Sequence, residues 1–276
     1  MSHFKYIGQK LFVENSSVLN IAKKNKTPFY LYSSRQLKEN YLSFAQTFKS
    51  VKPLICFAAK ANTNLTILKM LAGLGSGVDV VSGGELLKAL KAGIKPNKIV
   101  FSGVGKTEEE LKIAIKRKIL LINIESESEA RLINKIAENA KKKVSVGFRL
   151  NPNVDAKTHE KISTGKAENK FGISIKNFTS LYKNKNKFPN LKIDALSVHI
   201  GSQILSDKPY KKTLKILHKL IRDLNIRLKY VDLGGGFGIS YNKNEKQINL
   251  KKYAKLVLNF KRSLNCNIIF EPGRSL

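Results

Sequence analysis

Cysteine is scarce in this sequence, and the two that occur exclude several classes of protein. Cys56 and Cys266 lie far apart and form no Cys-X-X-Cys pair, which argues against a structural zinc site and a disulfide framework. No apolar run approaches the ~18 residues that a membrane span needs. The first residues also contain no continuous apolar stretch typical of a secretory signal. These absences predict a cytoplasmic protein with no membrane partner.

Acidic residues are also scarce, since 20 of them face 51 lysines and arginines and leave a formal net charge of +31. Such an excess suggests nucleic acid or another anionic surface as a partner. Only eight of the basic residues are arginines, whereas nucleic-acid readers favour arginine forks and stacking aromatics. The scattered lysines, with abundant asparagine and isoleucine, are typical of an A/T-rich coding sequence. We therefore do not expect a nucleic-acid partner, and a salt-dependent shift of DNA would contradict this.

Short apolar β-rich runs alternate with amphipathic helical stretches from residue 52 onward. The strand-like runs are 54–59, 78–82, 99–103, 120–125, 144–150, 195–201, 230–235 and 268–273. Strands that alternate with helices pair in parallel, and near-continuous apolar strands are buried on both faces. Eight such units predict an α/β fold, a (β/α)8 TIM barrel over residues 34–276. An open doubly wound sheet is the alternative.

Three segments depart from this repeat. Residues 27–33 form an isolated strand-like run ahead of a predicted helix from Ser34 to Phe48, so we assign residues 1–33 to an N-terminal segment whose strand needs partners outside the barrel. A long polar connection, 151–173, follows the fifth strand, and loops of that length are often functional. The sequence stops at Leu276, directly after the eighth strand. Because that strand needs a covering helix, this ending predicts a barrel truncated at its C-terminal end.

Chemically distinctive residues gather at the predicted strand ends, and in barrels of this kind the active site lies at the carboxyl ends of the strands. They are Lys60, Ser82, Gly83, Gly84, Glu85, Arg149, Asn151, His199, Ser202, Gly234, Gly235, Gly236, Gly238, Glu271, Gly273 and Arg274. Once the barrel closes, these residues should face one pocket.

Lys60 ends an apolar strand, where burial disfavours the charged ammonium and predicts a lowered pKa. A neutral amine is what Schiff-base chemistry requires, although a lysine whose stem covers apolar surface explains the position more simply. The glycine-rich turn at 234–238 is either a tight turn or a phosphate site, because exposed backbone N–H groups before a helix bind phosphate. An amine and a phosphate site together predict pyridoxal 5′-phosphate as the cofactor.

Three further residues suit such a cofactor, and each has a plainer interpretation. His199 would lie flat against the ring, or would be a satisfied core histidine. Glu271 would hydrogen-bond the pyridine nitrogen, or would pair with Arg274 or Arg149. Asp79 lies inside an apolar strand and therefore needs a buried partner.

Two other motifs fail on inspection of their spacing. The segment GVGKT (103–107) resembles the end of a P-loop, but Val100 stands where the first glycine is required. His159 and Glu160 are neighbours, but no second histidine stands at metal-ligand spacing. The sequence therefore predicts no metal site.

In their order along the chain, the motifs resemble those of the diaminopimelate decarboxylases, which belong to the alanine-racemase-like group of pyridoxal-phosphate barrel decarboxylases. The matching segments are FAAKAN (57–62), GVDVVSGGEL (77–86), FSGVGKT (101–107), the connection 151–173, VHIGSQI (198–204), DLGGGFGISY (232–241) and EPGRS (271–275). HIGSQI and the connection resemble the diaminopimelate branch more than the ornithine or arginine branch.

The resemblance implies decarboxylation of meso-2,6-diaminopimelate to L-lysine. Lys60 would form the Schiff base, His199 would stack on the ring, and Glu271 would sit on the pyridine nitrogen. The residues implied around the phosphate and the substrate are Ser202, Gly235, Gly236, Gly273 and Arg274, the last touching the substrate. Asp79, Glu85 and Arg149 are implied to support these groups.

The resemblance also implies a β-rich domain beyond this barrel, which completes the site of the neighbouring subunit in a homodimer. The run 27–33 would then serve that domain, and this chain alone would bind cofactor poorly and decarboxylate little. Two alternatives stay open: a relative acting on ornithine, arginine or carboxynorspermidine, and a non-catalytic pyridoxal-phosphate-binding fragment.

Overall fold

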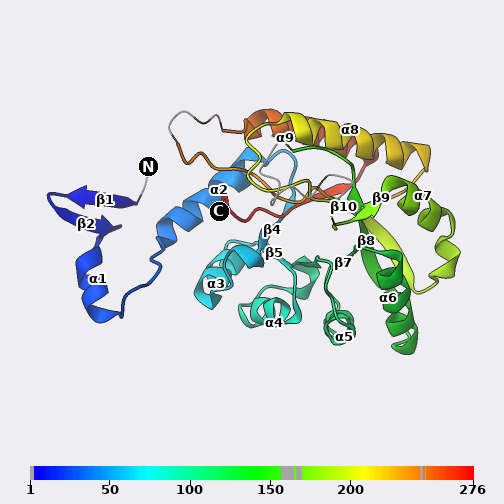
Figure 1. The fold of residues 1–276 in the computed structure, drawn as a ribbon, viewed down its shortest axis with the longest axis horizontal. Helices are drawn as coiled ribbons and strands as arrows, with labels where there is room; N and C mark the ends of the chain where they lie inside the picture. The colour runs from blue at the N-terminus through cyan, green and yellow to red at the C-terminus, as the bar shows by residue number, and fades with distance from the viewer. Residues whose placement is uncertain (1–2, 157–164, 166–169, 243–244, 246) are drawn as a thin grey trace.

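The computed structural model of the chain describes residues 3–156, 165, 170–242, 245 and 247–276 (Figure 1). Its centre is a ring of parallel strands: β4 (Leu54–Ala58), β5 (Gly77–Val80), β6 (Ile99–Phe101), β7 (Leu121–Ile124), β8 (Val144–Asn151), β10 (Leu191–Val198), β11 (Tyr230–Asp232) and β12 (Asn267–Phe270). Each strand pairs with the next, and β12 pairs with β4, which closes the ring. The predicted TIM barrel is therefore confirmed, and the open sheet is wrong. A two-residue strand, β9 (Ile173–Ser174), also pairs with β8.

Amphipathic helices follow the barrel strands and cover the outer face of the ring (Figure 1). They are α3 (Leu65–Gly73), α4 (Gly83–Lys91), α5 (Glu108–Arg117), α6 (Glu127–Asn139), α7 (Ile175–Lys183), α8 (Lys208–Asp223) and α9 (Leu250–Leu264). Short 3-10 turns form at η1 (Ala59–Ala61), η2 (Pro96–Lys98) and η4 (Lys185–Lys187). The three strands β10 to β12 end earlier than predicted. After β11 the chain leaves the extended conformation at Gly234, which has a φ of 65°.

Three successive helices begin with the same Ser/Thr-X-X-Glu pattern, and each glutamate reaches back to the chain near a strand end. Ser82 caps α4, Thr107 caps α5 and Ser126 caps α6. The glutamate three residues later accepts the N–H of Val81 in the first case and of Glu125 in the last. A local sequence signal thus fixes the direction in which the chain leaves each strand.

The helix that covers β12 comes from the opposite end of the sequence. It is α2 (Ser34–Thr47), which packs between α9 and α3. The ring of Phe44 lies 5.8 Å from that of Phe270, and the ring of Phe48 lies 4.6 Å from it. The amide of Asn40 also donates to the carbonyl of Leu276. The expectation that the eighth strand lacks a cover is therefore wrong, because α2 supplies the apolar face that a helix after β12 would have supplied.

The N-terminal segment forms a small sheet that the sequence reading missed. Strands β1 (Phe4–Ile7), β2 (Lys10–Val13) and β3 (Ser16–Ser17) pair antiparallel and precede helix α1 (Val18–Lys24). In Figure 1 this unit lies to one side of the barrel. Residues 27–33 pair with no strand of the described chain, in agreement with the expectation that their partners lie outside the barrel. The role of residues 1–33 in a further β-domain stays a prediction.

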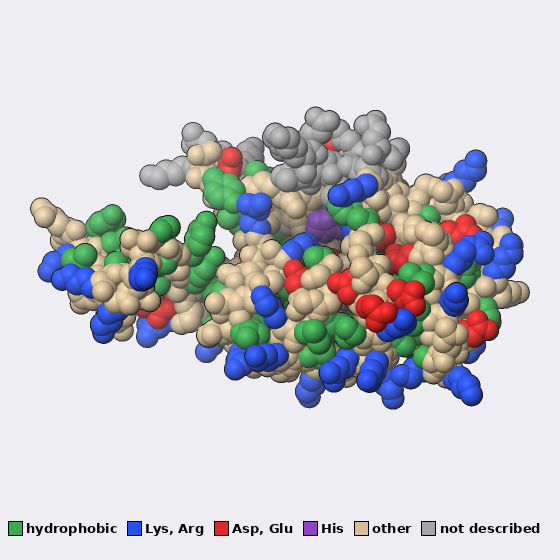
Figure 2. All heavy atoms as spheres, turned by 60° about the horizontal axis from the view of Figure 1, so that its bottom comes forward, with side chains coloured by type: hydrophobic (Ala, Val, Ile, Leu, Met, Phe, Trp, Pro, Cys, Tyr) green, Lys and Arg blue, Asp and Glu red, His purple; other side chains and the backbone are tan. Residues whose placement is uncertain are grey.

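Basic side chains are spread over the surface rather than gathered in one stripe, as the face in Figure 2 shows. Within the described residues, no helix combines the length and the apolar composition that crossing a bilayer requires. Both observations agree with the scattered lysines of the sequence.

The packing of α2 predicts that F48A destabilises the barrel. Phe48 is fully buried between α9 and β12, so its truncation leaves a large cavity. We expect a loss of about 3 to 5 kcal/mol in the free energy of unfolding, measured by chemical denaturation. The control is L42A on the same helix, whose side chain is exposed and whose loss should stay below about 1 kcal/mol. Equal effects of the two substitutions would contradict the covering role of α2.

Candidate active site

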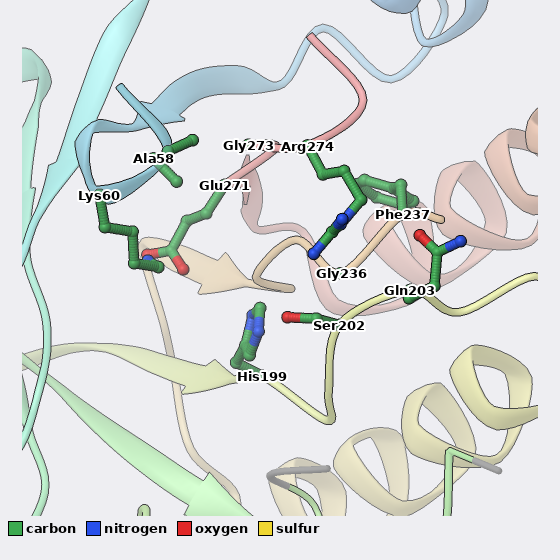
Figure 3. Close-up of a pocket in the computed structure, with 11 residues that line it drawn as sticks. Ala58, Lys60, His199, Ser202, Gln203, Gly236, Phe237, Glu271, Gly273 and Arg274 are labelled. Carbon is green, nitrogen blue, oxygen red and sulfur yellow. The ribbon is translucent and has the colours of Figure 1, made fainter. Parts of the chain in front are cut away.

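A cavity of about 420 Å³ opens at the carboxyl ends of the barrel strands (Figure 3). Its lining residues are Ala58, Lys60, Ala61, His199, Ser202, Gln203, Gly236, Phe237, Glu271, Gly273 and Arg274. A second cavity of about 350 Å³ shares Lys60, His199, Ser202 and Glu271 with the first. Its remaining lining residues are Val81, Ser102, Gly103, Val104, Arg149, Phe171 and Ser197. The four shared residues thus stand between two adjoining spaces.

Most of the predicted site residues meet here. Seven of them line the first cavity: Lys60, His199, Ser202, Gly236, Glu271, Gly273 and Arg274. Arg149 lines the second cavity, Asp79 holds Lys60, and Gly235 donates to His199. Glu85 is the exception, because it accepts the N–H of Val81 at the start of α4 and lines neither cavity.

Lys60 lies in η1, directly after β4, and its amine is held by the carboxylate of Asp79. Nζ and Oδ2 are 2.6 Å apart, the Asp79 side chain is fully buried, and 48% of the Lys60 side-chain surface borders open space. Burial lowers the pKa of Lys60, but the charges of Asp79 and Glu271 and the hydrogen bond to Asp79 together outweigh it, so the pKa is raised. The predicted lowering of this pKa is therefore wrong, because two carboxylates stabilise the ammonium.

Glu271 follows β12 and is buried beside another acid rather than beside an arginine. The hydroxyl of Ser102 lies 3.4 Å from its Oε1, and the carboxyl group of Asp232 interacts with it. Burial raises the pKa of Glu271 well above its usual value, and the charges of Asp232 and Asp79 raise it further. Burial likewise raises the pKa of Asp232. In the described chain, Glu271 has neither of the arginine pairs that were its alternative interpretation.

His199 is a neutral ring facing the cavity. Its Nδ1 accepts the N–H of Gly235 at 3.2 Å, so the proton of the neutral ring resides on Nε2. Burial lowers the pKa of His199 well below its usual value, and the charges of Arg149 and Lys60 lower it further. A neutral imidazole offers a flat apolar face at physiological pH.

The glycine-rich turn after β11 packs too tightly against its neighbours to carry side chains. A Cβ on Gly235 would lie 2.0 Å from the carbonyl oxygen of Glu271, and one on Gly236 would lie 2.1 Å from that of Gly201. Gly236 also has a positive φ of 84°. Within the described residues, no backbone carbonyl or side chain accepts the N–H of Gly236, which borders the first cavity.

Arg274 projects along the first cavity from the segment after β12 (Figure 3). Its Nη1 donates to the hydroxyl of Tyr241, and its guanidinium carbon lies 6.0 Å from the centre of the tyrosine ring. Arg274 is exposed, and Tyr241 holds its guanidinium at the edge of the cavity.

Comparison with known proteins identifies the family to which the chain belongs. Residues 34–276 match the family "Pyridoxal-dependent decarboxylase, pyridoxal binding domain". The chain is 48% identical over 255 residues to a diaminopimelate decarboxylase of Helicobacter pylori, covering 91% of this chain and 62% of that protein. It is 41% identical over 281 residues to a diaminopimelate decarboxylase of Vibrio cholerae, covering all of this chain and 67% of that protein. This chain belongs to the diaminopimelate decarboxylase family.

A crystal structure of the Helicobacter pylori diaminopimelate decarboxylase complexed with L-lysine has the same fold. The two superpose with a TM-score of 0.86 at 46% identity, over 93% of this chain and 66% of that one. The chain thus spans less than two thirds of the length of this relative. Its match with the family covers the pyridoxal-binding barrel.

The cavity of this barrel fits pyridoxal 5′-phosphate, the cofactor that the matched family binds. Oδ1 of Asp79 is buried and has no hydrogen-bond partner among the described residues, while Oδ2 holds the Lys60 amine. The N–H of Gly236 is available for a phosphate. An amine, a buried carboxyl group at Glu271 and a backbone donor are the groups that this cofactor requires.

Two features of the sequence interpretation lie partly or wholly outside the described residues. His159 and Glu160 are both outside, as is most of the connection 151–173. Among the residues that are described, no group of three His, Cys, Asp or Glu side chains is placed to hold a metal ion.

The sequence reading missed several polar residues around the site. Asp232 accepts Asn123 and Ser197 at Oδ2 and the N–H of Gly234 at Oδ1, so it links the barrel interior to the glycine turn. Glu125 holds Arg149 at 2.7 Å. The available signal for both was an acid at the end of an apolar strand, which is similar to the signal that singled out Asp79 inside one.

The raised pKa of Glu271 predicts how E271Q changes the pH dependence of stability. A carboxyl group whose pKa is higher in the folded chain than in the unfolded chain keeps its proton to a higher pH when folded. Its contribution to the free energy of unfolding therefore falls as the pH rises above the pKa of the unfolded chain. Glutamine cannot lose a proton. We therefore expect E271Q to gain stability relative to the unmodified chain as the pH rises from about 5 to about 8.

Chemical unfolding at a series of pH values, without cofactor, measures this difference. His199 titrates in both proteins and cancels in the comparison. The control is E127Q, which alters an exposed glutamate paired with Arg131 and should not follow the rise. If the difference in the free energy of unfolding between E271Q and the unmodified chain stays constant with pH, the pKa of Glu271 is not raised in the folded chain.

Proposed function

We propose that this cavity binds pyridoxal 5′-phosphate through Lys60, and that the whole protein converts meso-2,6-diaminopimelate to L-lysine. The observation that carries the proposal is the meeting of the Lys60 amine with the free N–H of Gly236 in one cavity. The names of the relatives and the lysine complex of one of them support the reaction and its product.

Lys60 would hold the cofactor through its amine, which can condense with an aldehyde with loss of water. Condensation needs the uncharged amine, so a proton must first leave Nζ. Asp79 is placed to take it, because Oδ2 lies 2.6 Å from Nζ and Oδ1 has no other partner in the described chain. Asp79 would then hold that proton close to the reacting atoms.

The other residues would orient the cofactor and the substrate. When bound, pyridoxal phosphate supplies an electron sink for the pair left by the departing carboxylate. Glu271 would bond the ring nitrogen, and the flat face of His199 would fix the plane of the ring. Gly236, with Ser202 and Gly273 beside it, would hold the phosphate.

Arg274 is the proposed contact for the substrate carboxylate. Its guanidinium borders the first cavity and is tethered by Tyr241. A planar guanidinium binds a carboxylate through two parallel hydrogen bonds, which fixes the position of the substrate as well as attracting it.

The substrate, the oligomeric state and the cellular location of the whole protein are also proposals. We propose diaminopimelate rather than ornithine, arginine or carboxynorspermidine, a homodimer, and a cytoplasmic location. Release of carbon dioxide from each of the four amino compounds tests the first, and light scattering of the whole protein tests the second.

Covalent labelling tests the proposed role of Lys60. The chain is incubated with pyridoxal 5′-phosphate, reduced with borohydride and digested, and the labelled peptide is identified by mass spectrometry. We expect the label on Lys60 and its loss in K60A. K91A, which changes an exposed lysine, should keep it. A label that falls on another lysine in the unmodified chain would overturn the site.

The glycine turn yields a second test of the same proposal. G236A places a methyl group against the carbonyl oxygen of Gly201. It also forces an alanine to adopt the positive φ that the turn requires at this position. We expect its dissociation constant for pyridoxal 5′-phosphate to rise by at least about tenfold, measured by fluorescence titration. G105A has open space around its Cβ and serves as the control. Unchanged affinity in G236A would remove the phosphate from this turn.

A further inference from the structure

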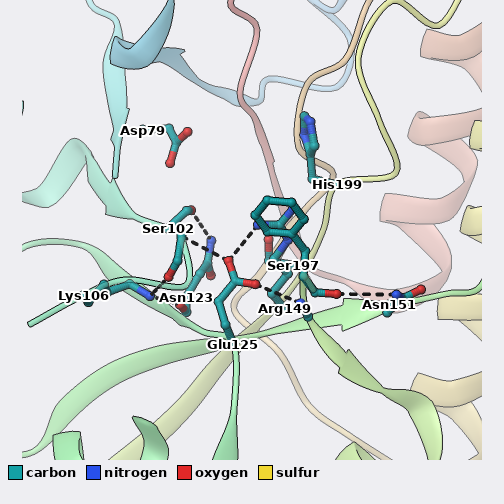
Figure 4. A network of polar contacts seen from close by, with 12 residues as sticks. Asp79, Ser102, Lys106, Asn123, Glu125, Arg149, Asn151, Ser197 and His199 are labelled. Carbon is teal, nitrogen blue, oxygen red and sulfur yellow. Dashed lines mark hydrogen bonds and ion pairs between the residues drawn. The ribbon is translucent and has the colours of Figure 1, made fainter. Parts of the chain in front are cut away.

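Glu125 stands at the carboxyl end of β7 and joins three segments that border the second cavity (Figure 4). Its Oε1 accepts Nη1 of Arg149 at 2.7 Å and the N–H of Gly103 at 3.1 Å. Its Oε2 accepts the N–H of Gly172 at 2.9 Å. One carboxylate thus ties together the loop after β6, the strand β8 and the segment before β9.

The two backbone donors are shaped for this contact. Gly103 has a φ of 98° and Gly172 a φ of 76°, a region that residues with a side chain rarely adopt. A Cβ on Gly172 would also lie 3.0 Å from the backbone nitrogen of Asn151. The glycines therefore allow both N–H groups to turn toward Glu125.

Glu125 is itself held in place by Glu129 and, through it, by Lys106. Its backbone N–H donates to Oε2 of Glu129 at 2.7 Å, and Oε1 of Glu129 pairs with Lys106 at 2.7 Å. The Lys106 side chain is fully buried and also donates to the carbonyls of Gly103 and Asn123. The lysine of the GVGKT segment, which fails as a P-loop, thus belongs to this network.

Arg149 is fixed on two sides by this arrangement. Its guanidinium carbon lies 4.7 Å from the centre of the Phe171 ring, and its Nη1 is bound to Glu125. Only 9% of the Arg149 side chain and 3% of the Glu125 side chain are exposed. A buried guanidinium that loses its carboxylate is left uncompensated and must move or recruit water.

We propose that Glu125 is a positioning residue, which holds Arg149 in the wall of the second cavity that Lys60 and His199 also line, and so sets the affinity for pyridoxal 5′-phosphate. The inference rests on the proposed function, because it concerns the cofactor of that site. Arg149 carries the positive charge that an anionic cofactor meets on this side. Its charge contributes to the lowered pKa of His199 and opposes the raised pKa of Lys60. Glu125 acts through Arg149 and does not itself line either cavity.

A double-mutant cycle tests this role. We compare the unmodified chain, E125Q, R149A and the double variant by fluorescence titration with pyridoxal 5′-phosphate, and quantify the borohydride-fixed label on Lys60. E125Q and R149A should each raise the dissociation constant by about tenfold or more. The double variant should be no weaker than R149A alone, because a residue that acts through Arg149 has nothing left to position. The matched control is E127Q in the first turn of α6, which should bind like the unmodified chain.

Each outcome decides a separate point. Normal affinity in E125Q or in R149A overturns the inference, and so do additive losses, which would assign Glu125 a purely structural role through Gly103 and Gly172. Absence of a Lys60 label in the unmodified chain instead overturns the proposed function. Circular dichroism accompanies every variant. If E125Q does not fold, the cycle is repeated with E125D in the unmodified chain and in R149A. E125D should then lower the affinity for pyridoxal 5′-phosphate only where Arg149 is present.

Discussion

The pairing of β12 with β4 is the constraint on which the site depends. Ile269 pairs with Leu54 and Phe270 with Ile55, and the N–H of Ala58 donates to the carbonyl of Pro272 at 2.9 Å. This closure brings the amine that follows the first barrel strand beside the carboxyl group that follows the last. Parallel pairing all round the ring then places every strand end on the same side, so residues that follow different strands can line the same two cavities.

Charge inside that cavity is set by acids rather than by burial alone. Asp79, Asp232 and Glu271 are all buried in the barrel, and Lys60 is the cation that Asp79 holds directly. In surroundings of low polarity a carboxylate attracts a proton or a cation strongly. The result is a raised pKa at both Lys60 and Glu271. The proton balance of the site is therefore set by this group of residues together and not by the burial of the amine alone.

A positively charged side chain stands on each side of the shared residues. On one side, Arg274 and the glycine turn border the first cavity; on the other, Arg149 borders the second and is neutralised by Glu125. Both arginines are held by another side chain, Tyr241 in one case and Glu125 in the other. Side chains fixed before a ligand arrives lose little entropy on binding, which favours an ordered complex.

The sequence by itself determined the barrel, because the alternation of apolar strands and amphipathic helices is a local pattern. It also determined which residues meet at the carboxyl ends, since parallel strands leave no other arrangement; Lys60, His199, Gly236 and Glu271 were found in this way. Tertiary structure alone decided that α2 covers β12, that the pKa of Lys60 is raised, and that Asp232 and Glu125 hold Glu271 and Arg149. Each of these depends on atoms from distant parts of the chain, and a pattern read along one segment contains no distance to another.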